Sequence, residues 1–305
     1  MKKLIPFLLL GLSLSSCRSA YIFSYFQDNG QDGLHLAYSE DGLKYTALNN
    51  NESYLTPMVG EDKLMRDPCI IQGPDGLFHM VWTVSWKEKG IGYANSTDLK
   101  NWSPQRYIPV MEHEESAMNC WAPEITYDPD NKEYMIYWAT TIPEKFTETK
   151  LSGDNKNNHR MYYVTTSDFV NFSDTKLLID PGFNCIDATI QKIDNEWVMF
   201  LKNETKIPVA EKNIVVGKSQ KLTGPYTIDR NPISENWVEG PTYTKTKLGH
   251  TLIFDGYTRH QMEGIASADL KTWRSIKDEI SFPKGTRHGT IFKVKKKVLK
   301  GLLGI

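Results

Sequence analysis

The sequence predicts an all-β fold, a five-bladed β-propeller, from three observations. A degenerate motif of the type S-x-D-L-x-x-W occurs five times, and the copies begin at Ser39, Ser96, Thr166, Ser219 and Ser267. Their start-to-start spacings are 57, 70, 53 and 48 residues, and one repeat of about this length per blade is typical of propellers. Between the copies lie runs rich in β-branched and aromatic residues, and no long segment of helical period interrupts them.

Each repeat is expected to form one blade of antiparallel strands. A polar segment forms the inner strand, and a turn then leads into an apolar second strand. These second strands begin at Leu77, Glu133, Glu196 and His250. A third strand ends in the repeated motif, whose Ser, Thr and Asp residues favour turns, and a short outer strand completes the blade.

The two ends of the chain complement each other. Residues 21–45 reach the motif copy at Ser39 with no polar inner segment before it, whereas the segment around His288 has no motif copy after it. We therefore expect the N-terminal strands to complete the last blade, which begins at residues 286–294. Such closure removes the exposed sheet edges that an open ring would present.

The N-terminus predicts export and a lipid anchor. An apolar run of 11 residues, Leu4–Leu14, follows two lysines and is too short to span a bilayer. It ends in L-S-S-C, so residues 1–17 resemble a bacterial lipoprotein signal with Cys17 as the lipid attachment site. An ordinary secretory signal is the alternative. Residues 21–305 are then expected to form one catalytic domain in the cell envelope, either periplasmic or at the surface.

The composition limits the kinds of molecule that the protein is expected to bind. The formal net charge is −1, which argues against nucleic acid and against a membrane surface, except through a lipid anchor. A monomer is expected. Three further cysteines lack metal-type spacing, and we expect them to be small buried residues near the axis rather than a disulfide. They are Cys69, Cys120 and Cys185.

A second series of polar residues follows the same repeat. Its members are spaced by 57, 63, 52 and 49 residues, and they are Asp67, Glu124, Asp187, Glu239 and His288. Equivalent positions of the inner strands surround the axis of a propeller, so these side chains should converge on one pocket. Carboxylates that converge repel one another unless they shift their pKa values for chemistry or hold a cation. Each segment alone is more typical of a structural turn, but the shared phase of all five favours a functional role for Asp67, Asp187 and Glu239.

These segments, taken in order, resemble family 43 of the glycoside hydrolases, five-bladed propeller enzymes that act on plant polysaccharides containing arabinose, xylose or galactose. The matching motifs are D-P at Asp67, W-A-P-x at Trp121, an isolated Asp187, E-G-P at Glu239 and H-G at His288. The resemblance implies that Asp67 is the general base, that Asp187 orients the acid and tunes its pKa, and that Glu239 is the general acid.

The resemblance also implies an inverting mechanism. The working carboxyl groups of inverting enzymes lie roughly 6.5–9.5 Å apart, and the acid has a raised pKa. We expect repulsion from Asp187 to raise the pKa of Glu239. We expect removal of terminal sugars by an α-L-arabinofuranosidase, with a β-xylosidase or an exo-β-galactosidase of the same family as alternatives. A polar insertion, Lys145–His159, is the candidate rim of the pocket.

Four residues are candidates for binding substrate. Trp121 either stacks on a sugar ring or packs in the core, and Glu124 stands where the family often has Asp. Arg287 contacts a sugar hydroxyl or is an exposed rim residue. His288 holds a water or ion on the axis, or is a structural residue. We expect the chemistry to require no cofactor. A structural Ca²⁺ on the axis is an open alternative, because no dedicated set of oxygen ligands is evident in the sequence.

Three other functions require sequence features that can be checked in this chain. Fructan-cleaving propellers that retain configuration carry an early W-M-N-D-P-N-G-like segment, which is absent here. A phosphorylase needs a basic phosphate site, for which Arg66, Arg287, Arg259 and His260 are thin candidates. A non-catalytic glycan-binding lipoprotein would be expected to have lost at least one of the three carboxyl groups, all of which are present.

Overall fold

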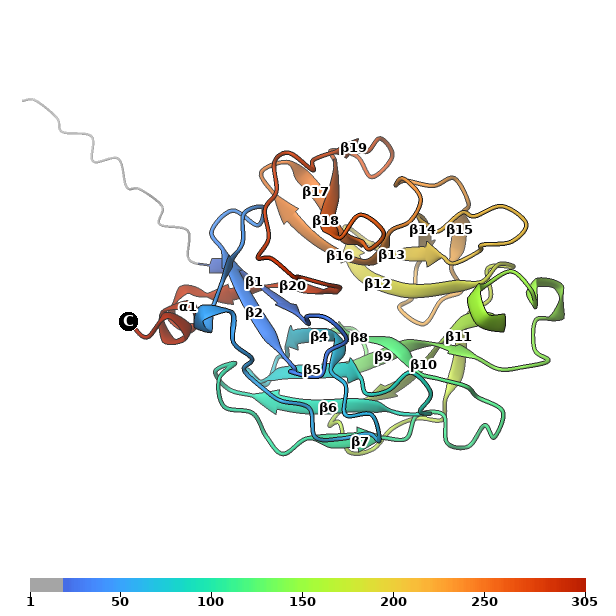
Figure 1. Cartoon of the computed structure of the whole chain (residues 1–305), viewed down its shortest axis with the longest axis horizontal. Helices are drawn as coiled ribbons and strands as arrows, with labels where there is room; N and C mark the ends of the chain where they lie inside the picture. Colours follow the sequence, from blue (N-terminus) through green and yellow to red (C-terminus); the bar gives the residue numbers. More distant parts are fainter. Residues whose placement is uncertain (1–18) are drawn as a thin grey trace, which may run out of the picture.

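The computed structural model describes residues 19–305, which form five four-stranded antiparallel sheets arranged as a ring (Figure 1). The predicted all-β, five-bladed propeller is therefore confirmed. The expected lipid site at Cys17 and the signal over residues 1–17 lie outside the described residues.

The strands of each blade follow the chain outwards from the axis. Blade one comprises β4 (Arg66–Gln72), β5 (Phe78–Thr83), β6 (Ile91–Ser96) and β7 (Arg106–Ile108). Blade two comprises β8 (Trp121–Asp128), β9 (Glu133–Thr141), β10 (His159–Thr166) and β11 (Lys176–Ile179). Blade three comprises β12 (Cys185–Ile193), β13 (Glu196–Asn203), β14 (Asn213–Ser219) and β15 (Thr227–Asp229). Blade four comprises β16 (Glu239–Thr246), β17 (Gly249–Gly256), β18 (Gln261–Ser267) and β19 (Arg274–Ser275).

Blade five is built from both ends of the chain. Its strands, from the axis outwards, are β20 (Gly289–Lys295), β1 (Ser19–Tyr25), β2 (His35–Ser39) and β3 (Thr46–Ala47). In the β1–β20 pair, Tyr25 lies opposite Gly289 and Ser19 lies opposite Lys295. The predicted closure of the ring by the N-terminal strands is confirmed.

The repeated motif caps the end of each third strand, as predicted. In blade one the Ser96 hydroxyl accepts a hydrogen bond from the Leu99 amide at 2.8 Å. The Asp98 carboxylate accepts hydrogen bonds from the amides of Lys100 and Asn101 at 2.9 and 2.8 Å. The polar residues of the motif therefore satisfy backbone groups of the turn rather than serving the axis.

Apolar clusters join each blade to its neighbours. Val81 of blade one shares a cluster with Trp138 of blade two, and Trp82 on the same strand shares another with Ile22 of blade five. Because strand residues alternate between the two faces of a sheet, one strand serves both interfaces. The three cysteines Cys69, Cys120 and Cys185 are free and buried, as expected.

The helices are short. They are η1 (Asn49–Asn51), η2 (Thr147–Thr149), η3 (Asp154–Lys156) and α1 (Lys296–Leu303). The sequence pattern did not predict α1, because two helical turns are too few for a helical period to stand out. Among the described residues, no helix combines the length and apolar character needed to cross a membrane.

Ring closure makes a direct prediction about stability. Phe23 of β1 is fully buried in the cluster that joins blades four and five. We expect Phe23→Ala to lower the free energy of unfolding by about 3–5 kcal/mol, because it opens a cavity at the closing interface. Urea unfolding measures this loss, and Val170→Ala at a 66% exposed position is the matched control, expected to change it by less than about 0.5 kcal/mol. A loss below about 1 kcal/mol for Phe23→Ala would contradict this view of the interface.

Candidate active site

The inner strands of the five blades enclose a pocket where they begin. Its volume is about 400 Å³. Most of its lining comes from two successive positions in blades one, two, three and five and from one position in blade four, at or close to the start of the inner strand. The strand-derived residues are Arg66, Asp67, Trp121, Ala122, Ile186, Asp187, Glu239, Arg287 and His288, and the others are Asp28, Asn29, Trp86 and Glu204.

A repeated β-bulge aims these side chains. Strands β4, β8, β12 and β16 each carry one extra residue against their partner strand near the pocket. At this point the backbone is left-handed, with φ values of 52°, 45°, 51° and 60° at Asp67, Ala122, Asp187 and Gly240. Bulges bend a strand and redirect its side chains, so this position and the one before it both face the pocket.

The bulge corrects the expectation for Glu124. The register aligns Arg66 with Trp121 and Glu239 before the bulge, and Cys69 with Glu124 after it. Glu124 is therefore two residues beyond the pocket position, and it lines a separate cavity with Cys69 and Thr290. Its side chain is buried and accepts a hydrogen bond from the Tyr137 hydroxyl at 3.0 Å, and burial raises its pKa to about 7. Its place does not support a substrate-binding role.

Asp67 is an ionised carboxylate. The Thr83 hydroxyl donates to its Oδ2 at 2.9 Å, and the His288 Nδ1 lies 3.3 Å from its Oδ1. Burial acts to raise the pKa of Asp67, but the hydrogen bond and charge of His288, aided by Arg66 and Thr83, lower it to about 2. The carboxylate is therefore ready to accept a proton from a water in the pocket.

His288 lies between two carboxyl groups. Its Nδ1 is 3.3 Å from Asp67 and 3.9 Å from the Oδ2 of Asp187. Burial alone would lower its pKa, but the hydrogen bond and charge of Asp67, with the charges of Asp187 and Glu239, raise the pKa to about 9. Its neighbour Gly240 must be a glycine, because a Cβ there would lie 2.2 Å from the His288 ring and φ is +60°.

Asp187 is a buried carboxyl group whose pKa is raised, unlike those of Asp67 and Glu239. Its Oδ2 accepts a hydrogen bond from the Gly240 amide at 3.0 Å, and its side chain is 6% exposed. Burial raises the pKa of Asp187 to about 6; Glu239 and Asp67 add to this increase, while His288 and Lys202 oppose it.

Glu239 differs from the expectation. Lys202 donates to its Oε2 at 3.2 Å, and Arg287 Nη2 lies 3.4 Å from its Oε1. Burial acts to raise the pKa of Glu239, but Lys202, His288 and Arg287 together lower it below its ordinary value. Without substrate, two close cations outweigh the repulsion that the sequence argument relied on, and the raised pKa belongs to Asp187 instead.

Lys202 is a candidate site residue that the motif pattern did not indicate. It lies on β13, opposite Ile186 of β12, and is 1% exposed. Its ammonium group contacts Glu239 and also Glu204 at 2.7 Å, and these acids, with Asp187, raise its pKa despite burial. The available signal was a lysine inside an otherwise apolar strand, because a buried lysine requires a partner.

The Arg287 side chain is held by two carboxyl groups rather than extending freely at the rim of the pocket. Its Nε donates to Asp255 at 2.6 Å in addition to its contact with Glu239. It still lines the pocket, so one guanidinium group both contacts Glu239 and borders the cavity.

Two tryptophans form an apolar wall of the pocket. The rings of Trp86 and Trp121 meet edge to face at 5.4 Å, and the Trp121 indole donates to the Trp86 carbonyl at 3.1 Å. The Arg66 guanidinium lies 4.2 Å from the Trp86 ring and donates to Asn29 at 2.9 Å. Trp121 therefore faces the pocket, where it is placed to stack on a ligand, rather than packing in the core. Trp86 joins it from a loop that lies outside the repeated motifs.

The insertion Lys145–His159 lies one layer outside the pocket. Its Asp154 pairs with Lys206 and, at 2.8 Å, with Lys212, which in turn pairs with the pocket residue Glu204. The insertion supports the wall through these ion pairs, but its residues do not line the pocket itself.

The axial donors do not suit a metal ion. No group of three or more His, Cys, Asp or Glu side chains in the described part of the chain is arranged to hold one. His288 is engaged by Asp67, and Asp187 accepts from a backbone amide, so the several free oxygen ligands that Ca²⁺ requires are not presented.

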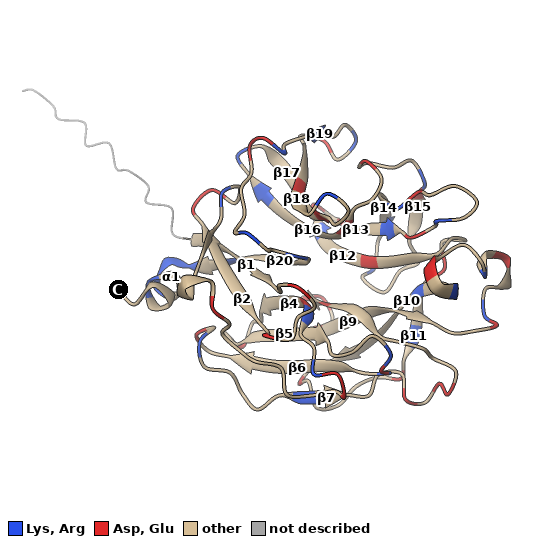
Figure 2. Ribbon diagram, in the orientation of Figure 1, with Lys and Arg blue, Asp and Glu red and all other residues tan. Residues whose placement is uncertain are grey.

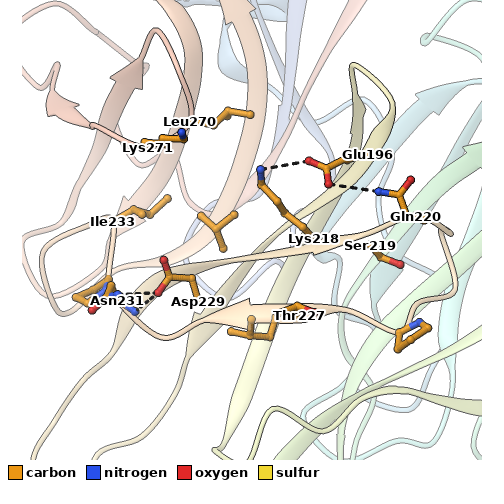
Figure 3. A pocket seen from close by; sticks show the side chains of 14 residues that line it. Glu196, Lys218, Ser219, Gln220, Thr227, Asp229, Asn231, Ile233, Leu270 and Lys271 are labelled. Carbon is orange, nitrogen blue, oxygen red and sulfur yellow. Dashed lines mark hydrogen bonds and ion pairs between the residues drawn. The ribbon is translucent and has the colours of Figure 1, made fainter.

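A larger hollow lies away from the axis. It has a volume of about 710 Å³ and is lined by outer strands of blade three and a turn of blade four (Figure 3). Several of its polar side chains bond to one another: Glu196 to Lys218 and Gln220 at 3.3 Å each, and Asp229 to Asn231 at 2.8 Å. None of the polar residues at the inner-strand positions lines it, so size alone does not make it the active site.

The environment of His288 predicts a pH dependence of stability. Its pKa is raised from 6.5 to about 9, so its contribution is fully present below about pH 6.5 and is lost as the pH rises through about 9. We expect the free energy of unfolding to fall across this interval by an amount on the order of 3 kcal/mol. Urea titrations from pH 6 to 10 measure the fall, and His288→Gln should remove it. An equal fall in the variant would contradict the assignment.

Comparison with known proteins agrees with this geometry. Residues 17–299 match the family-43-related group described as "Probable glycosyl hydrolase domain". Over 226 residues the chain is 25% identical to an α-L-arabinofuranosidase from Bifidobacterium longum subsp. longum, a match that covers 65% of this chain and 21% of that protein. The matched region thus spans about a fifth of the length of this curated relative.

Solved structures share the fold. An endo-1,4-β-xylanase from Bacteroides thetaiotaomicron is 12% identical, with a TM-score of 0.59 over 90% of this chain and 94% of that one. An α-L-arabinofuranosidase from Clostridium thermocellum is 13% identical, with a TM-score of 0.57 over 86% and 91%. At such identities the likeness concerns the fold alone, but the family match covers nearly all the described residues. The chain belongs to the family-43-related glycosyl hydrolases.

Proposed function

We propose that this protein is an inverting glycoside hydrolase that removes terminal α-L-arabinofuranosyl units from plant oligosaccharides or polysaccharides. The observation that carries the proposal is an ionised Asp67 on blade one and a buried Glu239 on blade four, both lining one pocket. Blades one and four are not neighbours in the ring, so the two carboxyl groups approach a bound sugar from different sides.

The proposed reaction is a single displacement. Asp67 removes a proton from a water as that water attacks the anomeric carbon. Glu239 donates a proton to the departing oxygen as the glycosidic bond breaks. The water oxygen enters on the face opposite the leaving group, so the anomeric configuration inverts. No cofactor takes part.

The proton for the leaving group has to reach Glu239 when substrate binds. In the substrate-free protein the pKa order favours a proton on Asp187 and a charge on Glu239. The two groups are close enough to titrate together, so the pair, rather than either residue alone, holds the acid proton. Asp187 thus acts as the proton reserve and electrostatic partner of the acid.

The choice of sugar rests on the pocket and on the relatives. A volume of about 400 Å³ is at the small end of ligand sites and favours a terminal sugar. The tryptophan wall offers apolar faces for a sugar ring. The curated relative is named an α-L-arabinofuranosidase, which favours that activity over the β-xylosidase and exo-β-galactosidase alternatives.

The proposal is tested by removing each working carboxyl group. We expect Asp67→Asn and Glu239→Gln each to reduce kcat on arabinofuranosides at least about 1,000-fold, because each deletes one proton-transfer step. Nitrophenyl glycosides and plant oligosaccharides serve as substrates, and proton NMR of the first product reads the anomer. Glu196→Gln, on the outer hollow of Figure 3, is the control.

Four outcomes would count against the proposal. Near-wild-type activity of either variant would remove the assigned roles, and retention of configuration would remove the inverting mechanism. Activity confined to xylosides or galactosides would replace the substrate while keeping the reaction. Glycan binding without turnover on the whole panel would favour a non-catalytic binding protein.

The coupled acid pair predicts a low alkaline limit of activity. The active form needs Asp67 charged and one proton on the Asp187–Glu239 pair, and that proton is lost as the pH rises through about 6. We expect kcat/KM, which reports the free enzyme, to fall above about pH 6. Lys202→Met should move this limb to higher pH, because it removes a cation that lowers the pKa of both acids.

Lys206→Met is the matched control for that shift. Lys206 pairs with Asp154 in the same ion-pair chain but does not contact Glu239. An unchanged profile in Lys202→Met, or an equal shift in both variants, would contradict the positioning role of Lys202.

A further inference from the structure

Lysines gather where the two ends of the described chain meet. Strand β20 runs into α1, and Ser19 of β1 lies opposite Lys295 (Figure 1). Figure 2 shows basic residues along α1. We define the lysine face as five residues: Lys100, Lys295, Lys296, Lys297 and Lys300.

Few acids offset these charges. Lys296 lies 3.4 Å from Glu40, an exposed ion pair that is screened by water. Lys100 reaches the face from the turn after β6, and its ammonium group donates to the Gly301 carbonyl at 3.1 Å. Lys295, Lys297 and Lys300 are exposed.

Apolar side chains lie beside the lysines. Leu299 and Leu302 of α1 are buried against blade five, which holds the helix in place. Leu303 and Ile305 are 40% and 82% exposed. Exposed apolar residues next to a row of lysines have the character of a segment that lies in a lipid–water interface.

We propose that the lysine face docks on an anionic lipid surface. Charge complementarity supports this partner, since four or more clustered lysines are attracted by acidic headgroups. The lipid expected on Cys17 would point to the same partner. That residue precedes Ser19 by two positions, a reach of at most about 7 Å, so a lipid on Cys17 would bring this face against the bilayer. One acyl signal plus a basic patch anchors far better than either alone.

The whole-chain net charge of −1 conceals this face. A membrane responds to charges within about a Debye length of its surface, roughly 8–10 Å, and not to the sum over the molecule. The sequence predicts membrane contact only through a lipid anchor. The proposal adds a direct contact between the lysine face and the bilayer.

The docking would keep the pocket clear of the bilayer. Gly289, next to His288, begins β20 at the pocket, and Lys295 ends the strand at the lysine face. Seven residues of strand separate these ends by about 20 Å. A protein held by the lysine face would present its pocket away from the lipid, where a polysaccharide can reach it.

Vesicle binding of the unlipidated chain from Ser19 onward tests the proposal. This segment contains all five blades. We expect co-sedimentation with vesicles containing phosphatidylglycerol, little with pure phosphatidylcholine, and loss in high salt. Lys297→Gln with Lys300→Gln should weaken binding about 25-fold, or about fivefold per lysine. Lys87→Gln with Lys284→Gln, two exposed lysines elsewhere, is the matched control and should leave binding unchanged.

Orientation is tested with a dye sensitive to its environment. The described cysteines are buried, so a new surface cysteine can be labelled selectively. A dye on Gly301→Cys should report a less polar environment when vesicles are added, and a dye on Lys284→Cys should not. Equal binding to both vesicle types, no binding, equal loss in both lysine variants, or comparable binding to duplex DNA or polygalacturonate would overturn the proposal. None of these outcomes depends on the proposed hydrolase activity.

Discussion

The ion pairs of His288 are the interaction on which the rest of the site depends. Charged groups are costly to bury unless they are paired, and the pocket brings together the carboxyl groups of Asp67, Asp187 and Glu239. His288 contacts two of them, while Lys202 and Arg287 contact the third. Burial acts to raise the pKa of both aspartates. The hydrogen bond and charge of His288 nevertheless lower the pKa of Asp67 to about 2, whereas the pKa of Asp187 rises to about 6 although His288 and Lys202 oppose the increase.

His288 is held in place by ring closure. It immediately precedes β20, and β20 is paired along its whole length with β1 from the other end of the chain. On the blade-four side, Gly240 has no Cβ that would clash with the His288 ring. The electrostatics of the pocket and the stability of the closing blade are thus parts of one arrangement, with the lysine face at the far end of the same strand pair.

The repeated bulge explains how one blade design serves different roles. Four inner strands share the same distortion, and the residues at and just before it face the pocket. Blade one places Arg66 and Asp67 there, whereas blade two places Trp121 and Ala122. The same backbone geometry with different side chains places an ionised carboxylate, an aromatic wall and a second carboxyl group around one pocket without any change in the fold.

The sequence by itself determined the architecture, because a repeat of turn motifs and apolar strands can be read locally. It also determined that Asp67, Asp187, Glu239 and His288 share an axis, since equivalent strand positions converge in a ring. It could not place Glu124, because this carboxyl group stands two residues after the bulge position, which blade two fills with Ala122. The spacings of the polar series vary by several residues from blade to blade, so a count along the chain does not resolve a displacement of two.

Only the tertiary structure decided the charges of the site. Lys202 and Asp255 stand at the same place on the second strands of blades three and four, opposite the residue before the bulge, but no shared residue type marks that place in the sequence. The pKa of a buried carboxyl group depends on every charge within a few ångströms, whatever its distance along the chain. The spacing of motifs could identify the acids, but the lowered pKa of Glu239 and the raised pKa of Asp187 follow from neighbours that only the folded chain brings together.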